Sequence, residues 1–169
     1  MRRIAAITRN PVAIALVAML AIAGCANKQT PNNAADLGLG GSGSAGTPGS
    51  SQDFTVNVGD RIFFDTDSSI IRADAQTTLS RQAQWLQQYG SYAITVEGHA
   101  DERGTREYNL ALGARRAAAA RDFLIARGIP ANRIRTISYG KERPVAVCDD
   151  ISCWSQNRRA VTVLGGAGS

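Results

Sequence analysis

The sequence predicts an α+β sandwich, in which two main helices pack on one face of a mixed sheet of about four to five strands. Short runs rich in β-branched and aromatic residues predict the strands. Apolar residues three and four positions apart predict the first helix, and a long run rich in alanine and arginine, after a capping threonine, predicts the second. With 169 residues, the chain is long enough for one domain with a hydrophobic core but not comfortably for two.

The first predicted elements lie between residues 54 and 90. FTVNV, residues 54–58, alternates apolar and polar residues, and RIFFD, residues 61–65, follows a Gly-Asp pair; both are predicted strands. Residues 65–69 are predicted to form a loop, because Asp, Thr and Ser side chains compete with the backbone for hydrogen bonds. Residues 73–89 are predicted to form the first helix, and Gly90 ends it.

The later elements include the second helix. Residues 92–97 mix β-branched and aromatic residues, which suits a half-buried strand. The second helix is predicted to start after Thr105 as its N-cap and to end near Arg127, where Gly128 and Pro130 stop it. The other predicted elements are a strand at 134–139, a loop or short helix at 149–157 and a last strand at 159–164.

The N-terminus has the parts of an export signal. Three arginines precede an apolar run from Pro11 to Ala23, which is too short for a comfortable transmembrane helix. Ile22-Ala23-Gly24-Cys25 resembles the bacterial lipobox, in which the thiol receives a lipid and the chain is cut just before it. We therefore predict a signal peptide at residues 1–24 and lipidation at Cys25. The alternatives are an ordinary signal peptide in which Cys25 is incidental, or a short buried helix.

Residues 25–52 are predicted to be the lipidated cysteine and a flexible tether, dominated by Gly, Ser, Asn, Pro and Ala, and residues 53–169 the folded domain. The formal net charge is +5, but Arg2, Arg3 and Arg9 lie in the predicted signal. Without these three, 16 of the 19 basic residues remain against 14 acidic residues, which gives a net charge of +2. No basic run remains, so we expect no nucleic-acid binding.

The sequence predicts neither a metal site nor catalysis. His99 is the only histidine, and no second His or Cys stands at a zinc-binding spacing. No nucleophile elbow or Gly-rich phosphate loop accompanies it. Cys148 and Cys153 could close a small loop in an exported protein, and both the bonded and the reduced state stay open. We expect no cofactor and no enzymatic activity; a periplasmic hydrolase is the catalytic alternative.

Acidic and basic side chains gather near the start of the second helix. Asp101 follows a strand and precedes a turn into the helix, where free backbone N–H groups lie. Arg115 and Arg116 lie further along the helix, about 100° apart, so only one of them can face a given partner. One carboxylate and one guanidinium would suit a zwitterion, by binding its ammonium and its carboxylate. The spacing leaves open whether these residues meet or are ordinary exposed charges.

The segment EGHADERGTREYNLALGARRA, residues 97–117, resembles the signature of the OmpA-like peptidoglycan-binding domains. It agrees more closely still with one branch, the peptidoglycan-associated lipoproteins. FFDTDSSIIR before the first helix, ISYGKERPV after the second and SQNRRAV near the end also match. The resemblance covers about residues 60–163, and the predicted lipobox and tether fit this branch as well.

The resemblance implies that the domain binds peptidoglycan non-covalently, through the meso-diaminopimelate of the stem peptide. Asp101 matches the family acid that binds the ammonium, Arg116 the arginine that binds the carboxylate, and Asp67 a loop position that contacts the ligand from the other side. The expected pocket walls and supporting residues are Phe64, Thr105, Asn109, Leu112, Asn157 and Arg158.

The resemblance also implies a location and a protein partner. Ala26, directly after the predicted lipidated cysteine, fits an anchor in the outer membrane of a Gram-negative cell, with the domain in the periplasm. Members of this branch engage the β-propeller protein TolB as part of the Tol-Pal system, which serves envelope integrity and cell division. The alternative function is a protein-interaction hub for TolB, with wall binding secondary.

Overall fold

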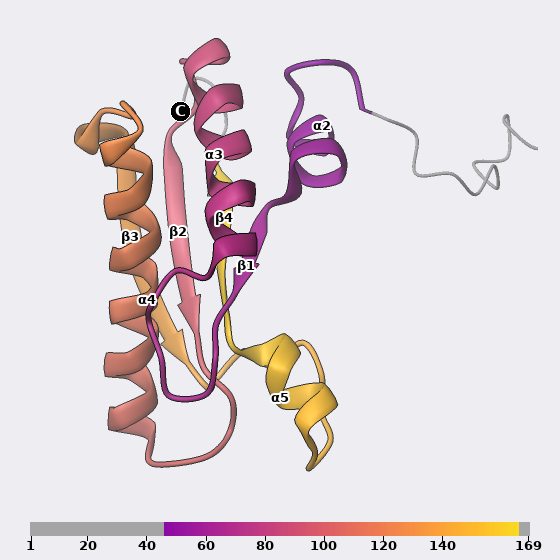
Figure 1. Cartoon of the computed structure of the whole chain (residues 1–169), viewed down its shortest axis with the longest axis vertical. Coiled ribbons are helices and arrows are strands. Elements are labelled where there is room, and N and C mark those ends of the chain that lie inside the picture. The colour runs from indigo at the N-terminus through magenta and orange to yellow at the C-terminus, as the bar shows by residue number, and fades with distance from the viewer. Residues whose placement is uncertain (1–45, 166–169) are drawn as a thin grey trace, which may run out of the picture. The chain divides into compact units, whose positions relative to one another are not determined.

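The computed structural model describes residues 46–165, which form a four-stranded mixed sheet with helices packed on it (Figure 1). In spatial order the strands are β1 (Arg61–Phe63), β4 (Arg159–Leu164), β2 (Ile94–His99) and β3 (Ile134–Gly140). β4 runs antiparallel to both β1 and β2, and β2 runs parallel to β3. The predicted α+β class and mixed sheet are therefore confirmed.

Two long helices, α3 (Ala73–Gln88) and α4 (Arg106–Ala126), lie along one face of the sheet (Figure 1). The shorter helices are α2 (Ser51–Asp53), the π-helix η1 (Phe54–Gly59), the 3-10 helix η2 (Ala131–Arg133) and α5 (Ile151–Asn157). Within residues 46–165, none of the helices has the length and apolar character that a membrane crossing requires.

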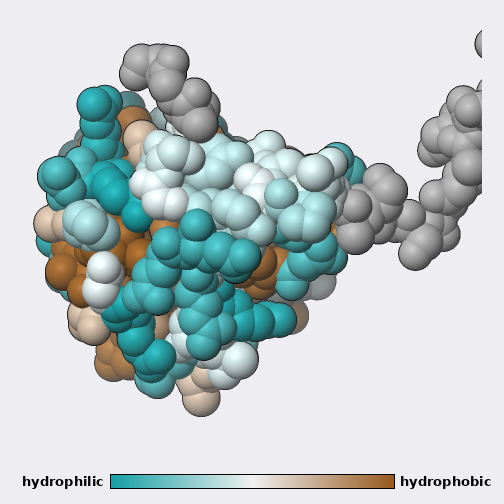
Figure 2. Space-filling model, turned by 90° about the horizontal axis from the view of Figure 1, so that it is seen from above, coloured by the Kyte–Doolittle hydropathy of each residue, from teal (hydrophilic) through white to brown (hydrophobic). Residues whose placement is uncertain are grey.

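The core lies between these two helices and the sheet. Leu79 and Leu86, two turns apart on α3, are fully buried, and on β2 the alternating residues Ile94 and Val96 face the same core. Each such side chain contributes about 1.5–3 kcal/mol by its burial. Viewed from one end, the surface is mostly hydrophilic, with hydrophobic residues showing between hydrophilic ones (Figure 2).

Two glycines let α4 rest directly on β2. A Cβ atom added to Gly98 would lie 1.8 Å from the carbonyl oxygen of Gly113, which no side chain can tolerate. This close contact fixes the height of α4 along the strand. It places Arg116, about one turn beyond Gly113, at the end of β2, where its Nη1 donates to the carbonyl oxygen of His99 at 2.8 Å.

The strand predicted at residues 54–58 is wrong, because these residues form the π-helix η1. A strand would place Phe54, Val56 and Val58 on one face, whereas a helix separates them. Phe54 is 1% exposed and Val58 packs against the core, but Val56 is 49% exposed. Ser50 caps the turn by accepting from the backbone N–H of Asp53 at 3.1 Å, so capping and packing override the alternating pattern.

The residues before η1 contact the domain. The Asp53 carboxylate accepts from the Trp85 indole N–H at 2.8 Å and from the backbone N–H of Gly49 at 2.9 Å. The Tyr92 hydroxyl donates to the carbonyl oxygen of Gly49 at 2.7 Å. The domain boundaries stay predictions, and the predicted signal peptide and Cys25 lie outside the described residues.

Candidate ligand-binding site

A cavity of about 240 Å³ opens where β2 ends and α4 begins. It contains five of the nine predicted ligand and pocket residues: Asp67, Asp101, Asn109, Leu112 and Arg116. The other lining residues are Thr66, Arg103, Gly104 and Tyr108. The structure therefore brings Asp101 and Arg116 to one cavity, which the spacing alone had left open.

Arg116 is fully buried and holds one wall of the cavity together. Its Nε donates to the carbonyl oxygen of Ser68 at 2.8 Å, and its Nη2 to that of Asp65 at 3.1 Å. With the bond to His99, these contacts join the loop after β1 to the end of β2. Its guanidinium also lies over the Phe64 ring, 5.2 Å from the centroid. A guanidinium carries five N–H groups, so donors remain for a ligand.

Burial lowers the pKa of Arg116 to about 10, and the nearby Asp101 carboxylate acts in the opposite direction. The guanidinium therefore stays charged at neutral pH. A buried cation that lines a cavity is a strong partner for a carboxylate, because little water competes for it.

The Asp101 carboxylate lies on the same cavity and is held by two arginines. Arg103 donates to it from Nη2 at 2.7 Å and from Nε at 3.2 Å, and Arg158 donates from Nη1 at 3.4 Å. Burial alone would raise the pKa of Asp101, but the hydrogen bonds and charge of Arg103, with Arg158, lower it below its ordinary value. Asp101 is therefore an anion at neutral pH.

Asp67 closes the cavity from the loop side. Its backbone has a φ of 54°, a left-handed conformation that few residues other than glycine adopt. Its carboxylate accepts a hydrogen bond from the Tyr108 hydroxyl, which joins the loop to the first turn of α4. This contact raises the pKa of Tyr108.

Four predicted residues lie outside the cavity lining. Thr105 caps α4 by accepting from the backbone N–H of Tyr108 at 3.2 Å. Phe64 lies under Arg116, and Arg158 holds Asp101 while its Nε donates to the carbonyl oxygen of Phe64 at 3.1 Å.

Asn157, expected near the site, holds a different loop. Its side-chain oxygen accepts from the backbone N–H groups of Val145 at 2.8 Å and Ala146 at 3.2 Å, and its Nδ2 donates to the carbonyl oxygen of Ala146 at 2.8 Å. A side-chain amide can satisfy a backbone donor and acceptor at once, which explains this use. Asn157 therefore supports the segment after β3.

His99 is buried and is not among the residues that line the cavity. Its ring nitrogens have no hydrogen-bond partner among the described residues, and Nε2 lies 3.6 Å from a carboxylate oxygen of Glu97. Burial, with the charges of Arg159 and Arg143, lowers the pKa of His99 to about 4, so the ring is neutral at neutral pH. Among the residues that the structure describes, no three His, Cys, Asp or Glu side chains gather to hold a metal ion.

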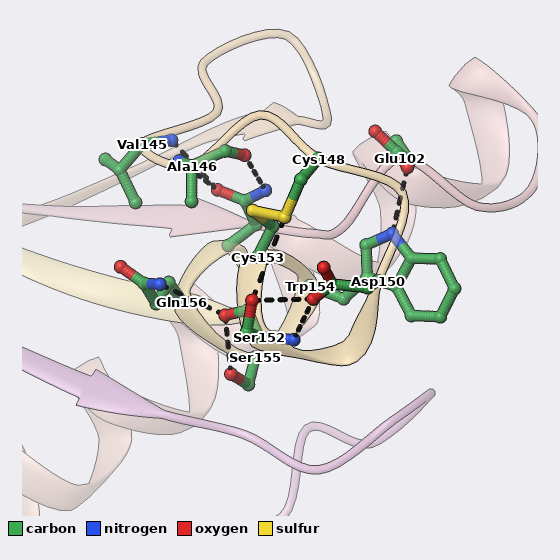
Figure 3. Close-up of a disulfide and its surroundings, with 11 residues drawn as sticks. Glu102, Val145, Ala146, Cys148, Asp150, Ser152, Cys153, Trp154, Ser155 and Gln156 are labelled. Carbon is green, nitrogen blue, oxygen red and sulfur yellow. Dashed lines mark hydrogen bonds between the residues drawn. A yellow bond between two sulfur atoms is a disulfide. The ribbon is translucent and has the colours of Figure 1, made fainter.

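A disulfide joins Cys148 to Cys153 beside the site (Figure 3). It ties the loop after β3 to α5, where the Asp150 side chain accepts from the backbone N–H of Ser152 at 2.7 Å. Trp154 follows Cys153 on α5, and its indole N–H donates to the Glu102 carboxylate at 2.9 Å (Figure 3). The disulfide loop, residues 148–153, is thus linked to the turn that carries Asp101.

Replacing Cys148 and Cys153 together by Ser is expected to lower the free energy of unfolding by about 2 kcal/mol, because the bond closes a short loop in the unfolded chain. Urea unfolding of the full-length chain in detergent measures this. Reducing agent should reproduce the loss in the native chain and change nothing in the double variant. Equal unfolding midpoints for the native and double-variant chains would contradict the expected loss.

The sequence model of the OmpA family matches residues 63–158, more than half of the chain. The chain belongs to the OmpA family. The match runs from β1 to the end of α5 and includes every residue that lines the cavity.

Named relatives of this OmpA-family chain include peptidoglycan-associated lipoproteins. One from Mesorhizobium japonicum is 83% identical over the full length of both chains. One from Pseudomonas aeruginosa is 39% identical over 85% of this chain and 89% of that protein.

Solved structures resemble the chain as well. The peptidoglycan-associated lipoprotein of Burkholderia pseudomallei has a TM-score of 0.61 at 42% identity, covering 63% of this chain and 90% of that one. The C-terminal domain of Helicobacter pylori MotB has a TM-score of 0.60 at 25% identity, covering 64% and 86%.

Four residues of the OmpA-family cavity were missing from the sequence prediction: Thr66, Arg103, Gly104 and Tyr108. Tyr108 could have been found, because it lies four positions before Leu112 and shares a helix face with the predicted lining residues. Arg103 carried no such signal. Its side chain folds back onto Asp101 two residues earlier, which only the conformation of the turn determines.

Proposed function

We propose that this chain is an outer-membrane lipoprotein whose periplasmic domain binds peptidoglycan without making or breaking a covalent bond. The observation that carries the proposal is the placement of Asp101 and Arg116 on one cavity, both buried and oppositely charged. Relatives of very high identity named peptidoglycan-associated lipoproteins support it.

The ligand that fits this pair is the far end of meso-diaminopimelate in the stem peptide. That end is an amino acid group, with one ammonium and one carboxylate on the same carbon. Asp101 binds the ammonium, and the free N–H groups of Arg116 bind the carboxylate. Asp67 lines the cavity from the loop and Tyr108 from the first turn of α4, and Leu112 adds apolar contact.

The expected affinity for this ligand follows from two charge-assisted hydrogen-bonded contacts. Each contributes about 1.5–3 kcal/mol, which supports a weak to moderate affinity at a single site. Many anchored copies on one polymer raise the overall attachment through effective concentration. Docking to a TolB-type protein and the lipid anchor at Cys25 stay predictions from the family resemblance.

Three stem peptides that differ only at the third residue test the proposal. The first carries meso-diaminopimelate, the second L-lysine, which lacks the far carboxylate, and the third α-aminopimelate, which lacks the far ammonium. Calorimetric titration of the full-length chain in detergent should show the first binding at least about tenfold more tightly than either of the others. Equal affinity for all three peptides would refute the two-charge site.

A further inference from the structure

The position proposed for the ligand ammonium already holds a cation of the chain itself. Arg103 approaches Asp101 with both Nη2 and Nε, at 2.7 Å and 3.2 Å. A ligand ammonium can reach the carboxylate fully only if this guanidinium moves away. The cavity therefore has an internal competitor for the anionic half of the site.

The two arginines on Asp101 differ in their freedom to move. The Arg158 side chain is 8% exposed and also donates to the carbonyl oxygen of Phe64, so it is fixed. The Arg103 side chain is 40% exposed. Exposed ion pairs are weak, because water can replace either partner. Of the two, Arg103 is the one that a ligand can displace.

The backbone around Arg103 is held in place while its side chain is displaced. The carbonyl oxygen of Arg103 accepts from Nδ2 of Asn109 at 2.7 Å. Lys141 Nζ donates to the carbonyl oxygens of Glu102 at 3.1 Å and Gly104 at 2.8 Å, on either side of it. Displacement therefore needs only rotation of the side chain.

Trp154 holds the guanidinium of Arg103 in its observed place. The guanidinium carbon lies 4.2 Å from the centroid of the Trp154 ring, a cation–π distance. The indole N–H is itself tied to Glu102 at 2.9 Å, and Cys153, next to Trp154, is bonded to Cys148 (Figure 3). Helix α5, tied by the disulfide, thus presents an aromatic face that keeps Arg103 beside Asp101.

We propose that Arg103 is an exchangeable internal cation that competes with the ligand ammonium for Asp101, and that Trp154 is its positioning residue. This inference rests on the proposed function. When a site is occupied part of the time by a cation of the chain itself, its apparent affinity for a ligand is the intrinsic affinity multiplied by the fraction of time that the site is free. The hydrogen bonds of Arg116 within the described residues go to backbone carbonyl oxygens and to no carboxylate, so the competition concerns only the ammonium half of the site.

Replacing Arg103 by Ala tests the competition with the same three stem peptides. The full-length R103A chain should bind the diaminopimelate and lysine peptides about three- to tenfold more tightly than the native chain, because both carry the far ammonium. The α-aminopimelate peptide, which has no far ammonium, should bind both chains equally. Arg106→Ala is the matched control, because Arg106 is exposed, pairs with Glu142 and lies outside the cavity lining.

Trp154 is tested by a pair of variants. Trp154→Ala should raise the affinity for the two ammonium-bearing peptides by about two- to threefold. Trp154→Phe keeps an aromatic face and should therefore bind these peptides with the native affinity. A merely structural role would change all three peptides alike. Thermal melting of each variant checks that the domain stays folded.

Each outcome decides between the claims. If the native chain binds the diaminopimelate peptide selectively and R103A binds it equally or more weakly, the competition is wrong and the two-charge site still stands. Binding by R103A but not by the native chain supports it in its strongest form. No selective binding by either chain overturns the two-charge site and the competition together.

Discussion

Replacing Asp101 by Asn is expected to weaken binding of the diaminopimelate stem peptide at least about tenfold, because a neutral amide cannot pair with the ligand ammonium in a buried site. The shape of the side chain is nearly unchanged, so the cavity keeps its volume. Its oxygen can still accept from Arg158, which lies beside it in the native chain. Titration of the full-length chain in detergent measures the loss.

Asp74→Asn is the matched control for this variant. Asp74 is exposed, pairs with Arg72 at 3.1 Å and lies outside the candidate cavity, so its replacement should leave the affinity unchanged. Native-like binding by the Asp101 variant would remove the anionic half of the proposed site. A thermal melt of both variants separates lost binding from lost folding.

Arg116→Lys is expected to lower both stability and affinity, although it keeps the charge. Arg116 donates in three directions to backbone carbonyl oxygens, of which the bond to His99 is buried and those to Ser68 and Asp65 are partly buried, and one ammonium on a flexible stem cannot reach all of them. Leaving one or two of these acceptors unsatisfied costs about 2–4 kcal/mol of unfolding free energy. The loop after β1 also loses its link to β2, so Asp67 loses its place at the cavity.

The neighbouring arginine provides the control. Arg115 is exposed and lies outside the cavity lining, so Arg115→Lys should change the unfolding free energy by no more than about 0.5 kcal/mol. Urea unfolding of both variants measures the difference. Similar curves for the two would mean that the buried contacts of Arg116 contribute little to stability.

The helices could be predicted because their signals are local. α3 buries Leu79, Ala83 and Leu86 at the predicted spacings, and α4 starts after Thr105 as expected, with the Thr105 side chain as its cap. β4 covers the predicted residues 159–164. Periodicity and capping depend on residues within one or two turns, which a sequence displays directly.

Residues 54–58 show where local pattern fails. The alternation of apolar and polar residues favours a strand, but these residues form a helix that contacts with distant residues stabilise. Phe54 packs against Trp85 with tilted rings whose centroids are 4.9 Å apart, and the Asp53 carboxylate accepts from the Trp85 indole N–H. Contacts between residues about thirty positions apart leave no trace in a short window of sequence.

The candidate site also has a part that the sequence could predict and a part that it could not. The family resemblance selected Asp101 and Arg116, but the burial of Arg116 rather than Arg115 depends on how α4 sits on Gly98. The contact of Trp154 with Arg103 joins residues from two separate segments. Such contacts are properties of the packed chain, so sequence reasoning alone could not supply them.

The most direct test of the proposed site pairs one protein change with one ligand change. The diaminopimelate and α-aminopimelate peptides are titrated into the native and Asp101→Asn chains. The native chain should prefer the peptide with the far ammonium by about tenfold or more, and the variant should distinguish the two by less than about twofold. If the variant keeps the full preference, the ammonium is bound elsewhere and Asp101 is not its partner.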